Sequence, residues 1–160
     1  MIGILSDSHD NLDRVRAAVA LFNDAGCDLV VHAGDFVAPF TADELRNLRA
    51  PVKAVFGNCD GEKAGLVKAF LGLGEIAAAP LRFSHTGLRF GLCHRDASVE
   101  RLAASKAFDV VIFGHTHRPL VERRAGILLV NPGEAGGWLR GKSTVALLDP
   151  VSLAAEIVPL

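Results

Sequence analysis

Short apolar runs alternate with helical patterns through the first two-thirds of the chain. Runs typical of buried strands lie at residues 1–6, 29–33, 52–56, 88–93 and 110–113. Between the first two, apolar residues recur at helical spacing from Leu12 to Phe22, and Gly26 ends the pattern. Further helices are predicted at residues 41–49, 62–71 and 98–107, the last with Ser98 as its N-cap. This part of the chain is therefore expected to contain strands joined by helices.

The rest of the chain is rich in strand pairs with little room for helices between them. Hairpins are predicted at residues 81–85 with 88–93, 120–124 with 127–130, and 144–148 with 154–158. Strand–helix repeats followed by hairpins predict an α/β fold of two packed sheets with helices outside, as a single domain over residues 1–160. The pattern defines no conformation for the loops at residues 37–40 and 73–80.

Composition narrows the functional classes. Half of the residues are hydrophobic, 22% are charged and the net charge is -1, which is ordinary for a globular protein and gives no strong nucleic-acid footprint. No apolar stretch approaches the roughly 20 residues of a membrane span, and the first apolar run is too short for a signal peptide. Three widely spaced cysteines predict no disulfide framework and fit a cytoplasmic protein. A homo-oligomer stays open.

Five polar clusters each follow one of the predicted strands. They are Asp7-Ser8-His9, Gly34-Asp35, Gly57-Asn58, His94 and Gly114-His115-Thr116-His117. The carboxyl ends of strands in an open α/β sheet border one crevice, so these side chains are expected to converge. In extended backbone, residues i and i+2 point the same way, and this spacing predicts that the pairs Asp7/His9 and His115/His117 face the crevice together.

The residue types favour transition metals. Four imidazoles, two carboxylates and one amide form a mixed nitrogen–oxygen set, which suits manganese, iron, zinc, cobalt or nickel better than calcium or magnesium. Seven ligands are too many for one tetrahedral zinc and fit two divalent metals that share a carboxylate. Such a pair attracts anions and suits in-line attack on phosphorus. A single-metal hydrolase is an alternative.

Each cluster alone is common in turns or cores, and only the ordered set points to a metal site. The two other histidines are predicted to be bystanders, His32 packed in the core and His85 exposed beside a turn. Cys27 and Cys93 are predicted to be core residues.

Residues 136–143 match a phosphate-binding P-loop pattern, but a strand pattern follows where that motif needs a helix. We therefore interpret them as a glycine-rich loop.

The five clusters, in this order, resemble the calcineurin-like metallophosphoesterase superfamily. The short length and Gly57-Asn58-Cys59-Asp60 are similar to its small bacterial and archaeal phosphodiesterase branch, which is related to the Vps29-type retromer subunit. The resemblance implies a four-layer αββα sandwich of two mixed sheets. It also implies one metal on Asp7, His9, Asp35 and His117, and a second on Asp35, Asn58, His94 and His115, with manganese preferred.

Three positions depart from that family pattern. Cys59 stands where many relatives have a histidine that protonates the leaving group, so Asp60 or a water would have to serve. Arg95 follows His94 where glycine is common, and it either binds substrate or points to solvent. Glu134 follows the turn Asn131-Pro132-Gly133, after which serine is frequent, and the sequence offers no role for it.

The prediction is a phosphoesterase that acts on a small phosphorylated substrate, preferentially a diester. A hydroxide bridging two divalent metals would attack in line, and Asp35, Asn58 and His94 would lie at the reaction centre. Three arginines are candidate contacts for the substrate phosphate: Arg95, Arg118 and Arg140. The alternative is a protein-binding scaffold like the retromer subunit, with little or no catalysis.

Overall fold

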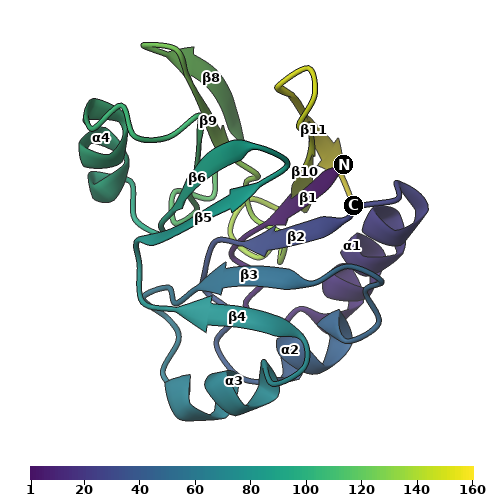
Figure 1. Ribbon diagram of the computed structural model, residues 1–160. Helices are drawn as coiled ribbons and strands as arrows, with labels where there is room; N and C mark the ends of the chain where they lie inside the picture. The colour runs from purple at the N-terminus through teal and green to yellow at the C-terminus, as the bar shows by residue number, and fades with distance from the viewer.

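The computed structural model describes residues 1–160, and its larger sheet has six strands (Figure 1). In spatial order these are β11-β10-β1-β2-β3-β4. Their bounds are β1 Ile2–Leu5, β2 Leu29–His32, β3 Val52–Val55, β4 Gly74–Ala77, β10 Thr144–Asp149 and β11 Ala154–Pro159. Strands β1 to β4 are parallel, and β10 pairs antiparallel with both β1 and β11. The carboxyl ends of β1, β2 and β3 therefore lie at the same edge.

The second sheet has five strands in the order β5-β6-β7-β9-β8. Their bounds are β5 Leu81–His85, β6 Leu88–Leu92, β7 Val110–Ile112, β8 Leu120–Arg124 and β9 Ile127–Asn131. The central pairs β6/β7 and β7/β9 are parallel, and the outer pairs are antiparallel hairpins. Both sheets are mixed, as predicted.

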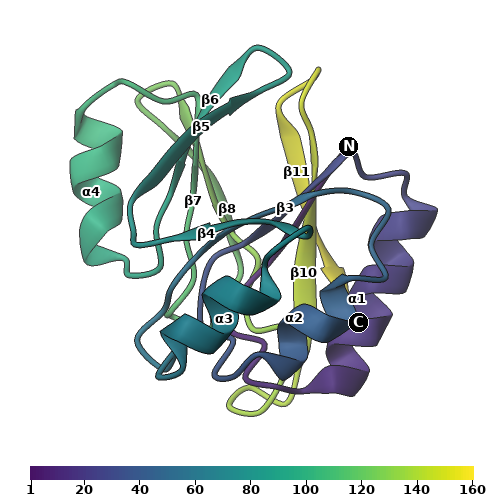
Figure 2. The ribbon, with the colours of Figure 1, turned by 60° about the horizontal axis from the view of Figure 1, so that its bottom comes forward.

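Helices cover the two outer faces of the sheets (Figure 2). The larger sheet carries α1 (Leu12–Asp24), α2 (Phe40–Leu45) and α3 (Lys63–Ala69), and the smaller sheet carries α4 (Ala97–Ala104). The predicted four-layer αββα sandwich is therefore confirmed. None of the helices is long and apolar enough to cross a membrane.

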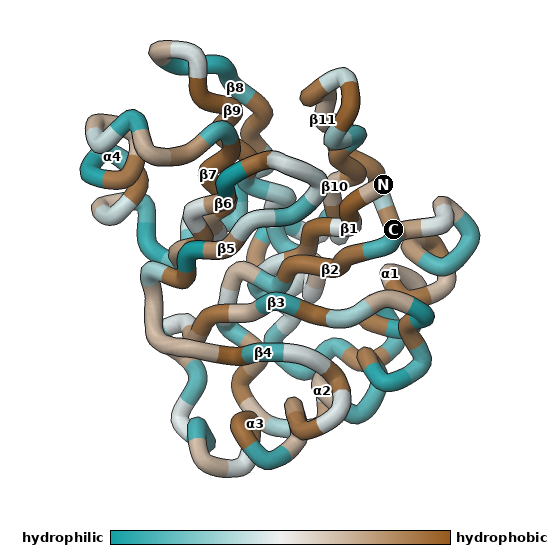
Figure 3. Tube along the Cα trace, in the orientation of Figure 1, coloured by the Kyte–Doolittle hydropathy of each residue, from teal (hydrophilic) through white to brown (hydrophobic).

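Alternation along the buried strands fills three separate apolar layers. In β2, Val30 points to the core under α1 to α3, whereas Leu29 and Val31 point to the core between the sheets. In β9, Leu129 packs in the core under α4, and its neighbour Leu128 in the core between the sheets. Strands that are buried on both faces are mostly apolar, and Figure 3 shows β1 and β2 as largely brown segments.

Several boundaries differ from the predictions. The segment at residues 73–80, for which the pattern gave no structure, contains β4, which pairs in parallel with β3. Helix α2 is shorter than predicted, and α4 begins after Asp96, whose carboxylate accepts the Ala97 N–H, so the prediction of Ser98 as N-cap was wrong. His85 is half-buried and lies 3.2 Å from Asp28, not exposed. A strand, β10, follows residues 136–143, which confirms the loop interpretation.

Candidate metal centre

The five predicted clusters lie together, but they come from the carboxyl ends of strands in both sheets. β1, β2 and β3 belong to the larger sheet, and β6 and β7 belong to the smaller one. Hydrogen bonds join the loops of one sheet to those of the other: His94 Nδ1 lies 2.8 Å from Ala33 O, and His115 N–H donates to Asp7 Oδ2 at 3.1 Å. The crevice is therefore formed where the two sheets meet.

The paired ligands reach the crevice by a different backbone geometry from the one predicted. Asp7 and His9 have φ values of 53° and 43°, and His115 and His117 have 68° and 56°. These are left-handed conformations, which cost a non-glycine residue free energy, so the prediction of extended backbone was wrong. Hydrogen bonds offset part of this cost, since His9 N–H donates to Asp35 O and His115 N–H donates to Asp7 Oδ2.

Two of the motif glycines are required by close approach. A Cβ atom on Gly57 would overlap the Asp35 carboxylate and backbone, and one on Gly114 would overlap the Ser6 hydroxyl and lie 2.7 Å from Asp7 Oδ2. Both glycines therefore let a neighbouring strand end come within contact of a carboxylate.

Asp35 is buried, and one of its oxygens is already occupied. Its Oδ1 accepts the Cys59 N–H at 2.7 Å. Its Oδ2 lies 3.4 Å from His94 Nε2 and 3.8 Å from His9 Nε2. Burial opposes ionisation, but hydrogen bonds from His94 and Cys59 hold the pKa of Asp35 below its ordinary value. The carboxylate is therefore charged at neutral pH, with Oδ2 facing two imidazoles.

His94 has a defined tautomer. Its Nδ1 lies 2.8 Å from the carbonyl oxygen of Ala33, which can only accept, so Nδ1 carries the proton. Nε2 faces the carboxylate of Asp35 and the Asn58 side-chain oxygen, 3.1 Å away, and it would present its lone pair to a metal ion bound among them. This orientation is the one that a metal-binding imidazole needs.

Asp7, His9 and His117 form a second group of candidate ligands. His117 Nε2 lies 3.3 Å from Asp7 Oδ1, and the rings of His9 and His117 are stacked with centroids 5.3 Å apart. Burial raises the pKa of Asp7 above its ordinary value. Asp7 Oδ1, His9 Nε2 and His117 Nδ1 are buried without a hydrogen-bond partner, which is costly unless another group binds them.

These residues fit divalent metal ions. Candidate ligand atoms lie within 4.8 Å of one another in three overlapping groups, and they combine carboxylates with imidazoles. The groups are Asp7/His9/His117, Asp7/Asp35/His94 and His9/Asp35/Cys59. A cation among them would also bind Asp7 Oδ1 and His9 Nε2, two of the three buried atoms without a partner.

The remaining predicted ligands lie at the border of the same cavity. His115 belongs to none of the three groups, but its ring centroid is 5.2 Å from that of His94. Asn58 is exposed and reaches His94 through its side-chain oxygen. Both line a cavity of about 450 Å³ whose other walls are His9, Asp35, Cys59, Thr116, His117, Leu139 and Arg140. The structure therefore brings all seven predicted ligands to one place, five tightly and two at the edge.

Asp60 has a structural role that the sequence did not predict. Its Oδ2 accepts the N–H groups of Asp35 and Gly57 at 3.1 and 2.7 Å, and its Oδ1 accepts the Val37 N–H at 2.7 Å. The side chain is buried. Since both oxygens are engaged with backbone, the prediction of Asp60 as a proton donor is not supported.

Glu134 lies behind His117. Its Oε2 is 3.2 Å from His117 Nδ1, and its two oxygens accept the N–H groups of Leu139 and Arg140. The residue is 1% exposed, and although burial opposes ionisation, these contacts lower its pKa. The only feature of the sequence that could have indicated a role for Glu134 is its position as an acidic residue among small and apolar neighbours.

Asn131 is a third residue whose part in the site the sequence did not reveal. It is buried at the end of β9, and its Nδ2 donates to Gly114 O at 2.9 Å and to Thr116 Oγ1 at 3.1 Å. It therefore holds the loop that carries His115 and His117. The sequence showed it only as part of a turn.

His32 is a core residue, as predicted. Its Nδ1 accepts the Gly34 N–H, so Nε2 carries the proton and faces Ser8 Oγ at 3.0 Å. The ring stacks on Phe36. Burial lowers its pKa to about 3, so it stays neutral in the folded protein. Cys27 and Cys93 are buried, also as predicted.

The three candidate arginines are exposed and line cavities at the border of the metal centre. Arg140 lines the cavity that contains the ligands, and a cavity of about 460 Å³ next to it is lined by Arg118 and Arg140. Arg95 lines a third cavity of about 250 Å³ on the side of Asn58 and His94. None of the three guanidinium groups makes an ion pair or a hydrogen bond.

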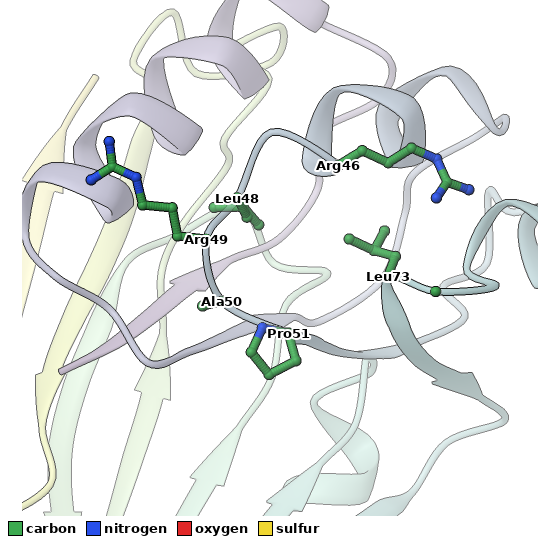
Figure 4. Close-up of a pocket in the computed structure, with 7 residues that line it drawn as sticks. Arg46, Leu48, Arg49, Ala50, Pro51 and Leu73 are labelled. Atoms are coloured by element: carbon green, nitrogen blue, oxygen red, sulfur yellow. The ribbon is translucent and has the colours of Figure 1, made fainter.

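A further cavity of about 290 Å³ lies away from the ligands, at the amino ends of β3 and β4 (Figure 4). Arg46 and Arg49 flank it and point away from each other. The Arg46 guanidinium donates to the carbonyl oxygens of Ala69 and Leu71. The cavity has no acidic, histidine or cysteine side chain, so it offers no metal site.

Comparisons with known proteins agree with the motif pattern. A family model for the calcineurin-like phosphoesterase superfamily domain matches residues 1–152. The phosphodiesterase MJ0936 of Methanocaldococcus jannaschii is 38% identical over 152 residues, which cover 92% of each chain. The phosphodiesterase YfcE of Escherichia coli K12 is 31% identical over 142 residues, which cover 80% of this chain and 75% of that one.

Solved structures share the fold. An archaeal phosphodiesterase superposes with a TM-score of 0.93 at 36% identity over 99% of both chains. Vps29 of Chaetomium thermophilum superposes with a TM-score of 0.73 at 18% identity, over 99% of this chain and 93% of its own, and this likeness concerns the fold alone.

Proposed function

Since the chain belongs to the calcineurin-like phosphoesterase superfamily, we propose that it is a metal-dependent hydrolase of phosphate esters, with diesters preferred. The observation that carries the proposal is the buried convergence of two carboxylates and three imidazoles, with Asp7 Oδ1 and His9 Nε2 left without partners. A net charge near zero leaves a small phosphorylated molecule as the expected substrate.

We assign the ligands to two overlapping sets. Asp7, His9, Asp35 and His117 would hold one divalent ion, and Asp35, Asn58, His94 and His115 would hold the other. The position of Asp35 Oδ2 between His94 and His9 supports its role as the shared ligand. Manganese is the preferred metal, and iron, zinc, nickel and cobalt are compatible with the same donors. When bound, the ions would lower the pKa of the attacking water and stabilise charge on the phosphoryl and leaving oxygens during in-line displacement.

The chain's own polar groups would bind the substrate. Arg95, Arg118 and Arg140 have free guanidinium groups at the border of the cavity and would contact phosphate. No strong acid is available for the leaving group, because Asp60 is engaged with backbone. Partial desolvation and the Asp35 carboxylate raise the pKa of the Cys59 thiol to about 11. Water would then donate the proton, which favours esters with good leaving groups.

The test is hydrolysis of bis(p-nitrophenyl) phosphate by protein stripped with a chelator and reloaded with one metal at a time. We expect no turnover without metal and the highest rate with manganese. Metal analysis under saturating conditions should give two ions per chain, and a single ion would support a one-metal hydrolase instead.

The competing function is a protein-binding scaffold, because the chain shares its fold with Vps29. The complete set of seven candidate ligands favours an enzyme. Metal-loaded protein that binds both ions but hydrolyses no mono- or diester would favour the scaffold.

A further inference from the structure

Arg118 and Arg140 have no counter-charge, and they line the same cavity beside the metal centre. Four other arginines pair with carboxylates, among them Arg89 with Asp109 at 2.8 Å and Arg16 with Glu44 at 2.6 Å. Arg118 and Arg140 make no such pair and no side-chain hydrogen bond. Two like charges on one cavity are unfavourable unless an anion lies between them.

The cavity that they share borders the cavity of the metal centre. It has a volume of about 460 Å³ and is lined by Phe113, Thr116, Arg118, Pro119, Leu120 and Arg140. Thr116 and Arg140 also line the cavity that contains the metal ligands. A ligand bound at the metals can therefore extend past Arg140 toward Arg118.

Backbone contacts fix both arginines in place. The loop at residues 136–141 is held by Glu134, which accepts the Arg140 N–H, and by Trp138, whose Nε1 donates to His9 O at 3.3 Å. On the other wall, the Arg118 N–H donates to Thr116 Oγ1 at 3.4 Å, and Pro119 restricts the backbone of Arg118, which precedes it. The walls are therefore ordered parts of the site, and only the long side chains need to adjust.

We infer that Arg118 and Arg140 form a subsite for a second phosphate, carried on one arm of the phosphodiester substrate. This inference rests on the proposed function, and it adds a substrate class. Guanidinium groups bind phosphate through paired, charge-assisted hydrogen bonds. An ester with a terminal phosphate on its arm would place that group between the two arginines while the diester lies at the metals.

A matched pair of chromogenic substrates tests the subsite. Thymidine 5′-(p-nitrophenyl phosphate) and its 3′-phosphorylated form share the scissile ester and differ only by the second phosphate. We expect the 3′-phosphorylated form to have a kcat/KM at least about tenfold higher, and Arg118→Ala or Arg140→Ala to reduce this ratio to near one. Arg49→Ala is the control, because this arginine lies at the distant cavity of Figure 4 and should leave the ratio unchanged.

The outcomes separate the two proposals. Metal-dependent turnover of both substrates with a ratio near one in the wild-type protein would overturn the subsite and leave the proposed function standing. A ratio that survives both arginine substitutions would overturn it as well. If neither substrate nor bis(p-nitrophenyl) phosphate is hydrolysed with any metal, the proposed function fails and the subsite fails with it.

A second inference rests on the carboxylate behind His117. His117 Nδ1 is buried without a hydrogen-bond partner, and buried Glu134 places its Oε2 3.2 Å away. His117 Nε2 faces Asp7 Oδ1 on the other side of the ring. The geometry points to Glu134 as a positioning residue, which keeps the proton on His117 Nδ1 and so presents the Nε2 lone pair to the metal.

Metal affinity tests this role independently of turnover. Glu134→Gln retains an acceptor for the N–H groups of Leu139 and Arg140 but removes the charge beside His117. We expect one ion to bind about 10–100-fold more weakly in a chelator competition, with the other unaffected. In the His117→Ala background the same substitution should have no further effect. Unchanged affinity for both ions would overturn the role.

The wild-type protein offers a measurement that needs no variant. Nitrogen-15 NMR of the histidine side chains should show the proton of His117 on Nδ1 in the metal-free state. A proton on Nε2 would contradict the inference.

Discussion

The floor and the border of the metal centre are built in opposite ways. On the floor, Asp7, Asp35 and His94 are buried, and backbone groups from neighbouring loops bind each of them. At the border, Arg95, Arg118 and Arg140 are exposed and their guanidinium groups have no partner. The floor is thus organised before any ligand binds, whereas the border can adapt. We infer that the floor sets the chemistry and the border sets which substrate enters.

The largest effect is expected from the centre of the floor. Asp35→Asn removes the charge at the oxygen that faces both His9 and His94, so both ions should be lost and kcat/KM should fall about a thousandfold or more. Metal analysis and the diester assay measure this. The exposed Asp43→Asn on α2 is the control. Near-normal turnover in Asp35→Asn would exclude a shared bridging ligand.

Cys59 lies where floor and border meet, and replacing it tests the missing proton donor. Cys59→His should raise kcat/KM about a hundredfold for an alkyl ester, and much less for a p-nitrophenyl ester, whose leaving group needs no proton. Rates across a series of leaving groups measure this. Cys59→Ser, which cannot serve as an acid either, should leave the series unchanged. An equal gain in all esters would indicate a changed metal affinity instead.

Beneath the floor, His32 links stability to pH. Its pKa of about 3 in the folded protein is below its ordinary value of 6.5, so the unfolded chain takes up a proton that the folded protein does not. The stability that neutral His32 contributes is present above pH 6.5 and is lost as the pH falls toward about 3. Between pH 7 and 5, the free energy of unfolding of the metal-free wild type should fall about 2 kcal/mol more than that of His32→Gln.

Urea unfolding at the two pH values measures the difference. The variant should also retain both metal ions, because His32 bonds to Ser8 and Gly34 and not to the ligand atoms. Equal pH dependence in the two proteins would mean that His32 is protonated in the fold. Loss of one ion would mean that the ligand set is larger than seven.

The smallest effect is expected at the border. Arg95→Ala should raise KM about threefold with little change in kcat, since exposed charges contribute little in high dielectric. Arg101→Ala on α4, outside the cavities, is the control. A large fall in kcat for Arg95→Ala would place this arginine on the floor with the metal ligands.

The sequence by itself determined the two packed sheets with helices outside and the five ligand clusters. Both follow from local patterns: apolar runs in buried strands, and glycines before Asp35, Asn58 and His115 where the strand ends approach one another. The tertiary structure decided what depends on contacts between distant residues.

Those contacts include the engagement of Asp60 with the loops after β2 and β3, and the position of Glu134 behind His117. They also include the left-handed backbone at Asp7 and His9, which persists because the loop after β2 binds their N–H groups. A periodic pattern carries no information on such pairings, because the partner lies on another strand or in the other sheet. The identities of the ligands were therefore readable in the chain, but the groups that hold them in place were not.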